Sequence, residues 1–181
     1  MSGSPSTRLL LLLALASGPC LADEQSVTLL DITSSVPADW VASEPSSGMR
    51  LLQFTVPADG AGESAQLVVY YFGPGQGGSL EANVARWSSQ FSTDDGPVEP
   101  VITPLDGNFP ATLVELTGNY ARGVGVGPAG DALPNRTLLA GVVETPRGSL
   151  YPQLHGPAEV VAKHQADFVR FITGMQPVPT P

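Results

Sequence analysis

The segment from residue 65 to residue 72, with the sequence AQLVVYYF, constrains the fold more than any other part of the chain. It is apolar on both faces and rich in β-branched and aromatic residues, which is typical of a strand inside a sheet rather than at its edge. Tyr70 and Tyr71 face opposite sides of such a strand, so we expect at least one of them to belong to the core. The segment predicts a sheet with this strand at a central position.

Other segments alternate apolar with polar residues, as half-buried strands do. They predict strands at residues 27–32, 52–56, 111–117, 138–144 and 149–154. The first is expected to close at residues 36–40, a proline turn that ends in Trp40. The last two are joined by Thr145-Pro146-Arg147-Gly148, a type I turn sequence that predicts an antiparallel hairpin.

Two segments have helical periodicity. The first begins at Ser79, a good N-cap, with Glu81 in the first turn, and its apolar face would be Leu80, Val84, Trp87 and Phe91. The second covers residues 158–173 and stops at Gly174, a natural C′ residue. Its apolar stripe would be Val160, Val161, His164, Phe168, Phe171 and Ile172.

The order of these elements predicts an α+β fold, in which two helices pack on a mainly antiparallel, twisted sheet. Cys20 is the only cysteine of the chain, so no internal disulfide can form. Stability must therefore come from the burial of apolar surface.

The first 22 residues have the pattern of a secretory signal. Arg8 precedes an apolar run over residues 9–16, and small residues at Cys20 and Ala22 suit a signal peptidase. The run is shorter than the ~20 residues of a membrane-spanning helix. We expect cleavage after Ala22, with lipid attachment at Cys20 as the alternative. The expected organisation is a signal peptide at 1–22, a single domain at 23–176 and a disordered Pro-rich tail at 177–181.

The net charge of −9 restricts the partners. An acidic surface without a Lys or Arg cluster repels phosphate backbones and anionic lipid headgroups, which disfavours nucleic-acid and membrane-surface binding. We expect an exported monomer, most simply periplasmic, whose partner is another envelope protein or a small ligand.

The combination of elements resembles the Mog1/PsbP-like fold family, which has exported bacterial members. The residues that carry the resemblance are the turn Pro37-Ala38-Asp39-Trp40, the Ser79-capped helix after a central strand, and a final helix with Phe168 and Phe171. The chain departs from the family's frequent Ser-Phe ending, since it reads Ile172-Thr173-Gly174-Met175. The resemblance implies an accessory or binding role without catalysis and assigns no site residues.

Residues 73–78 match G-x-G-x-x-G between a strand and a helix. A dinucleotide site also needs a second parallel strand that ends in an acid about twenty residues on. Asp94 and Asp95 have that spacing but follow no apolar strand, and Ser79 stands where a P-loop would continue toward its lysine. The glycines are better explained by a sharp turn, although Ser79 and the free N–H groups of the helix start could hold an anion. We predict no cofactor.

The binding surface predicted from the sequence joins this loop to the segment 120–136, which is rich in glycine and proline and predicts an irregular, mobile loop. Its candidate residues are Gly73, Gly75, Gln76, Gly77, Gly78, Ser79, Tyr120 and Arg122.

Catalytic and metal-binding residues are not predicted. His155 and His164 are the only histidines, too few for a typical metal site, and no G-x-S-x-G motif is present. Asp94 with Asp95, or Glu115 with Glu144, are conceivable carboxylate pairs. The alternative to a binding protein is therefore a small periplasmic hydrolase that uses such acids or a histidine.

Overall fold

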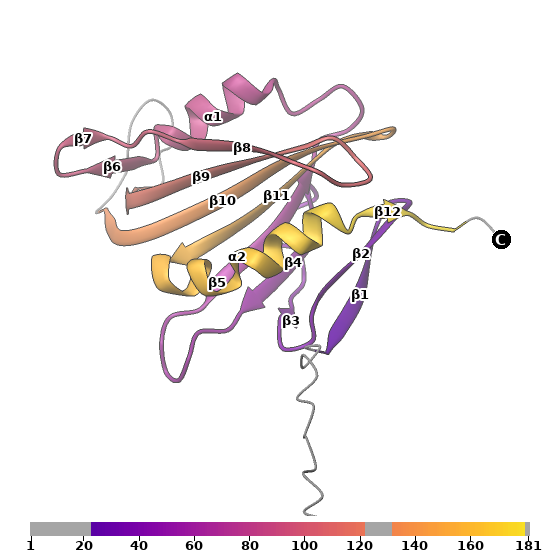
Figure 1. The fold of residues 1–181 in the computed structure, drawn as a ribbon, viewed down its shortest axis with the longest axis horizontal. Coiled ribbons are helices and arrows are strands. Elements are labelled where there is room, and N and C mark those ends of the chain that lie inside the picture. Colours follow the sequence, from indigo (N-terminus) through magenta and orange to yellow (C-terminus); the bar gives the residue numbers. More distant parts are fainter. Residues whose placement is uncertain (1–22, 122–131, 180–181) are drawn as a thin grey trace, which may run out of the picture.

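The computed structural model describes residues 23–121 and 132–179 (Figure 1). In chain order their elements are β1 (Glu24–Leu29), β2 (Ile32–Pro37), β3 (Val41–Ala42), β4 (Arg50–Val56), β5 (Ala65–Tyr71), α1 (Leu80–Ser88), β6 (Phe91–Thr93), β7 (Gly96–Pro97), β8 (Val101–Leu105), β9 (Ala111–Tyr120), β10 (Leu133–Thr145), β11 (Gly148–Pro157), α2 (Ala158–Thr173) and β12 (Gln176–Pro177). No helix in these two stretches is long and apolar enough to cross a membrane.

The main sheet has the strand order β3-β4-β5-β11-β10-β9-β6-β7. β8 is not in this order: it pairs with residues 111–115 of β9, and β6 pairs with residues 119–120 of the same strand. Its neighbouring strands are antiparallel. β5 lies between β4 and β11, which confirms the central position predicted for its apolar sequence. The predicted hairpin is formed by β10 and β11, where Thr145 pairs with Gly148 and leaves Pro146 and Arg147 as the turn.

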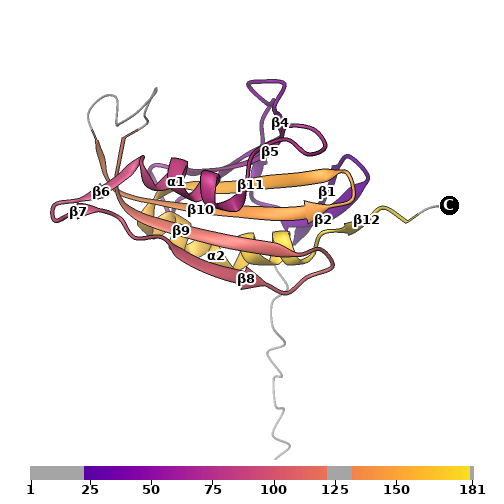
Figure 2. The same ribbon diagram turned by 90° about the horizontal axis from the view of Figure 1, so that it is seen from above.

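The two helices cover opposite faces of the sheet (Figure 2). Neighbouring residues of one strand separate the two cores: Leu113 packs in the α2 core and Val114 in the α1 core. The α2 core contains the apolar stripe predicted for this helix, and all six residues of the stripe are buried. The α1 core is smaller and is centred on Trp87, which is 2% exposed. The α+β architecture predicted from the sequence is confirmed.

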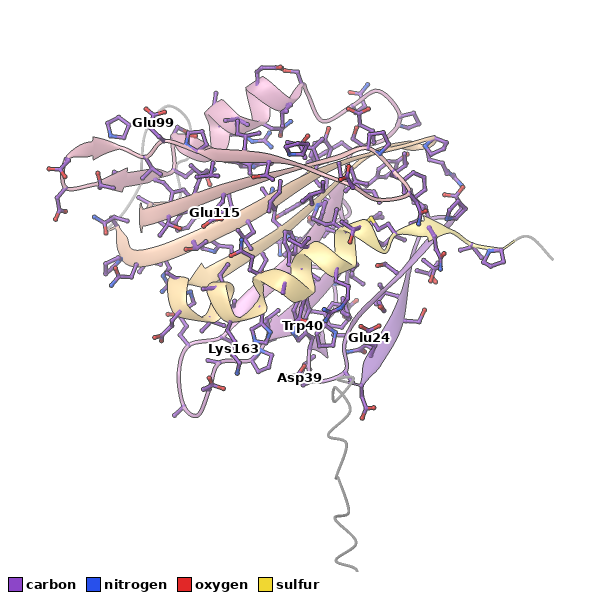
Figure 3. The ribbon with its side chains drawn as sticks, in the orientation of Figure 1. Glu24, Asp39, Trp40, Glu99, Glu115 and Lys163 are labelled. Carbon is purple, nitrogen blue, oxygen red and sulfur yellow. The ribbon has the colours of Figure 1, made fainter. Side chains whose placement is uncertain are left out.

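A small second sheet closes the α2 side. β1, β2 and β12 form it, and the Ser34 hydroxyl of β2 donates to the Phe171 carbonyl of α2 at 2.6 Å. Trp40 follows β2 and lies against α2, where its ring meets the ring of His164 edge-on at 5.7 Å (Figure 3). This three-stranded sheet therefore holds α2 in place on the side that faces away from the main sheet.

The first predicted strand, residues 27–32, is wrong in its boundaries. The chain forms two strands there, joined by a turn at Leu30 and Asp31, with Leu30 at a φ of 59°. A left-handed leucine gives no turn signal in the sequence, because this conformation normally requires Gly or Asn. The missed turn hid the β1–β2 ribbon.

Two further predictions concern the ends of the helices. Phe91 does not extend the face of α1 but begins β6, where it pairs with Tyr120 of β9. Helix α2 stops at Gly174 as predicted, yet Gly174 has a φ of −81°, so its left-handed freedom is not used. An added Cβ at this position would lie 2.8 Å from the Arg170 carbonyl oxygen. The residue is therefore a glycine because a side chain would not fit here.

Two predicted irregular segments contain strand. Tyr120 ends β9, and residues 133–136 belong to β10, so the expected loop 120–136 is shorter; residues 122–131 lie outside the described residues. The expected disordered tail is corrected at its start, because Pro177 pairs with Ile32 and the Val178 N–H donates to the Asp31 carbonyl at 2.8 Å. Pro177 is tolerated since it sits in a two-residue edge strand. The predicted signal peptide also lies outside the described residues.

Candidate functional site

The glycine-rich loop 73–78 turns the chain from β5 into α1. Gly73, Gly75, Gly77 and Gly78 all have positive φ angles, which L-residues with side chains rarely adopt. The buried Tyr151 packs beneath the loop, and its hydroxyl donates to the carbonyls of Gln76 at 3.3 Å and Gly78 at 3.4 Å. A Cβ at Gly77 would lie 2.3 Å from that hydroxyl oxygen. The loop is thus fitted to the sheet by close packing.

The polar groups at the start of α1 are already engaged. The Ser79 hydroxyl accepts the Ala82 N–H at 3.2 Å, as an N-cap does. Hydrogen bonds from its own backbone N–H and from the Ser79 hydroxyl hold the pKa of Glu81 below its ordinary value of 4.5. The side-chain amide of Asn83 donates to the carbonyls of Gly77 and Ser79, both at 2.9 Å. Because the Glu81 carboxylate already occupies the helix start, this position is poorly suited to an external anion.

The G-x-G-x-x-G pattern lacks the context of a dinucleotide site. β5, which precedes the loop, pairs antiparallel with both β4 and β11. Asp94 and Asp95 lie exposed in the turn between β6 and β7 and end no parallel strand. The fingerprint requires a parallel βαβ unit, which this sheet does not provide at that position.

The described parts of the two predicted loops lie at opposite ends of the sheet. The glycine-rich loop follows Tyr71, which lies opposite Leu150 near the start of β11. Tyr120 pairs with Leu133 at the start of β10, the end of the sheet where β11 finishes. Most of the length of β11 therefore separates them, and Arg122 lies outside the described residues. The sequence could not show this, because it depends on the strand register.

A pocket lies between these two ends, on the face of the sheet that carries α1. Its volume is about 450 Å³, and we call it the α1-face pocket. It is lined by Met49, Arg50, Gln66, Val68, Tyr70, Phe72, Arg86, Trp87, Gln90, Tyr120, Leu138, Gln153 and His155. α1 has only nine residues, and no other helix of the described residues lies on the β4–β5–β11 part of this face, where the pocket is found. Of the candidates predicted for the binding surface that lie among the described residues, Tyr120 alone lines it.

Aromatic rings stand at both ends of the pocket. At one end the rings of Tyr70 and Phe72 are parallel, with centroids 6.2 Å apart, and Phe72 meets Tyr151 edge-on at 5.5 Å. At the other end the rings of Tyr120 and His155 lie 4.3 Å apart. Tyr70 is half-buried on this face and Tyr71 is half-buried on the other, so each contributes an edge to one core rather than filling it.

Two arginines line the pocket from different elements. The Arg50 guanidinium lies 5.4 Å from the centre of the Tyr70 ring and donates to the Gln53 side chain at 2.7 Å. Arg86 of α1 donates to the Asn83 side chain at 2.5 Å. The other described basic residues, Arg136, Arg147, Lys163 and Arg170, all form ion pairs with carboxylates. Within residues 23–121 and 132–179, Arg50 and Arg86 are the basic residues that form none.

The remaining candidates for chemistry are dispersed. His155 lines the α1-face pocket, but His164 lies on the buried face of α2, between the Pro57 carbonyl at 3.1 Å and the Asp167 carboxylate at 3.4 Å. Glu115 lies opposite Leu139 and Glu144 opposite Ser149, so these acids are roughly 17 Å apart along the strands. No group of three potential metal ligands occurs among the described residues.

Sequence reasoning missed most of the pocket, although a signal for part of it exists. Gln66, Val68 and Tyr70 lie on one face of β5, and Gln153 and His155 lie on the matching face of β11. Polar residues that interrupt an otherwise buried strand can mark a binding face. The contribution of Arg86 and Gln90 depends on where α1 sits, which periodicity alone does not determine.

Comparison with known proteins identifies the fold. The sequence matches no protein-family model and no curated protein. Among solved structures, the solution structure of cyanobacterial PsbP from Synechocystis is similar over 91% of this chain and 98% of that protein, with a TM-score of 0.53 at 13% identity. A Pseudomonas aeruginosa protein of unknown function is similar over 87% of this chain and 99% of its own, with a TM-score of 0.48 at 15% identity.

The chain has a Mog1/PsbP-like fold. This confirms the resemblance drawn from the Pro37-to-Trp40 turn and the final helix. At 13% identity the likeness shows the arrangement of helices and strands. The chemistry of a site in this Mog1/PsbP-like protein has to be argued from its own residues.

Proposed function

We propose that this protein is an exported, non-enzymatic binding protein whose ligand occupies the α1-face pocket. Its first 22 residues would be removed as a signal peptide, and the domain would act in the periplasm as a monomer, as an accessory to a larger envelope assembly. The signal-like pattern of the sequence supports export, and the Mog1/PsbP-like fold is compatible with an accessory role.

The observation that carries the proposal is the chemistry of the pocket walls. Gln66, Gln90 and Gln153 offer amide groups that both donate and accept hydrogen bonds, and aromatic rings stand at each end. A volume of about 450 Å³ lies in the range of small-molecule sites, where a few convergent polar groups sit among apolar ones. These are groups that orient and hold a ligand.

The hydrolase alternative rests on one specific observation, the position of His155 in the pocket. A general acid or base must reach a bound substrate, and His155 does line the space that a ligand would fill. A screen of esters, phosphate esters and glycosides with the purified protein tests it. Turnover that is abolished in His155→Ala would contradict the binding proposal.

Recovery of the mature protein from its native envelope tests the main proposal. We expect N-terminal sequencing to begin at Asp23, and mass spectrometry of the denatured protein to show a retained small molecule. Gln66→Trp, which fills the pocket from an exposed position, should lose that molecule. Thr103→Trp, on the exposed edge strand β8, is the matched control and should keep it. Equal retention by both variants would place the ligand elsewhere, and an N-terminus at Cys20 would indicate lipid attachment.

A further inference from the structure

The two arginines of the α1-face pocket are unusual in their surroundings. The chain is acidic, with a net charge of −9, and acidic side chains pair with the other described basic residues. The described residues that line the pocket include neither Asp nor Glu. Neither guanidinium is paired with a carboxylate of the described residues, so both leave positive charge at the pocket.

The guanidinium groups also keep unused donors. A guanidinium carries five N–H donors in a fixed plane, and the described residues take one hydrogen bond from Arg50 and one from Arg86. The Arg50 guanidinium lies over the Tyr70 ring within cation–π distance, and most of its N–H donors are left for other acceptors. A guanidinium with free N–H donors can bind a carboxylate or phosphate group through two parallel hydrogen bonds.

Glu63 is the acid that could compete for the pocket, because its carboxylate and His155 are close enough to interact electrostatically. Its carboxylate is already bound by Arg136 through two hydrogen bonds of 2.8 and 2.6 Å. It is therefore not available to neutralise the two pocket arginines.

We infer that the α1-face pocket binds a small organic anion, with a carboxylate or phosphate group held between Arg50 and Arg86 and a flat apolar group against the aromatic wall. The Tyr70–Phe72 pair and Trp87 supply that wall, and the three glutamines can bind polar atoms of the ligand. The inference rests on the proposed function and specifies the ligand class of the same pocket.

The test measures binding of three related probes to the ¹⁵N-labelled full domain by NMR titration: phenylacetate, phenyl phosphate and the neutral phenylacetamide. We expect both anions to shift the indole signal of Trp87 and backbone signals of β5 and β11, and phenylacetamide to bind about tenfold more weakly. The comparison of phenylacetate with phenyl phosphate shows which anion the site prefers.

Variants identify the binding groups. Arg50→Gln and Arg86→Gln should each weaken anion binding about tenfold, while Arg50→Lys, which keeps the charge but not the planar fork, should lie between wild type and Arg50→Gln. Arg147→Gln, an exposed arginine in the β10–β11 turn, is the control and should bind as wild type does. Unchanged thermal midpoints show that the variants are folded.

The outcomes separate the two proposals. Equal binding of phenylacetamide and phenylacetate at the pocket signals, or anion binding that survives both glutamine substitutions, would overturn the anion inference and leave the pocket as a binding site. Absence of any shift at pocket residues with all three probes would overturn the anion inference, whereas the proposed function would still be decided by the molecule retained in the native protein.

Discussion

At the scale of single residues, Gly77 shows most clearly how a motif can be structural. It has a φ of 99°, and its missing side chain leaves room for the buried ring of Tyr151. The hydroxyl of that ring donates to the loop on either side of Gly77. The ring cannot move away without losing these hydrogen bonds and its packing in the α1 core.

Gly77→Ala should lower the free energy of unfolding by about 2–4 kcal/mol, because it adds a steric clash to a strained backbone angle. Gly75→Ala is the matched control: Gly75 also has a positive φ, of 68°, but a Cβ there would meet nothing within 4 Å. It should cost about 1 kcal/mol. Urea denaturation measures both values, and equal losses would refute the role of Tyr151.

The ion pair between Glu63 and Arg136 makes stability depend on pH. A hydrogen bond from Arg136 holds the pKa of Glu63 below its ordinary value of 4.5. Because the folded-state pKa is the lower one, this contribution is fully present above about pH 4.5 and is lost as the pH falls through the folded-state pKa. Glu63→Gln should therefore show a shallower loss of thermal midpoint with acid than wild type does. Parallel curves for the two proteins would contradict this contribution.

At the scale of elements, β12 is short but links the two ends of the described chain. It pairs with β2, and the Asn108 side chain donates to the Met175 carbonyl just before it at 3.1 Å. The Val178 N–H extends the contact to Asp31 in the β1–β2 turn. These hydrogen bonds hold the β1–β2 hairpin, which the sequence did not predict, against the end of α2.

A chain that stops after Met175 should lose about 1–2 kcal/mol of stability, since it gives up the backbone hydrogen bonds of β12 and of Val178. Removal of residues 179–181 alone is the control and should change nothing measurable. Chemical denaturation of both truncated proteins is the measurement. A loss of the same size in both would show that β12 does not contribute.

At the scale of the whole molecule, one sheet carries two cores, and each core has its own tryptophan. Trp40 packs in the α2 core and Trp87 in the α1 core. Strands β5, β10 and β11 contribute residues to both, so neither core can lose its sheet face without disturbing the other. The molecule should therefore unfold as one cooperative unit.

Trp40→Phe and Trp87→Phe leave one fluorescent reporter in each core, so their denaturation curves can be compared with circular dichroism of the same protein. The fluorescence and circular dichroism midpoints of each variant should coincide. Phe168→Leu, in the α2 core, should lower the stability reported by Trp87 on the opposite face by about 1–2 kcal/mol. A Trp87 signal that does not respond would show that the two cores unfold independently.

The sequence by itself determined the elements that depend on local pattern. The run of residues 65–72 required a central strand, the apolar stripe ending at Ile172 required a helix that covers the sheet, and the Pro146-Arg147 turn required a hairpin. These follow from periodicity and turn chemistry, which act over a few residues. Together they were sufficient for the α+β class and the Mog1/PsbP-like resemblance.

Only the tertiary structure decided where the α1-face pocket lies and how the first and last strands pair. The β1–β2 turn at Leu30 and the pairing of Pro177 depend on contacts with residues far away in the sequence. The local sequence therefore does not predict them. The pocket lies beside the short α1, over β5 and β11, and it brings Arg50 and Arg86 to one space from different elements. Which side chains come together in such a pocket depends on the strand register and on the position of the helix. Both result from the packing of the whole chain.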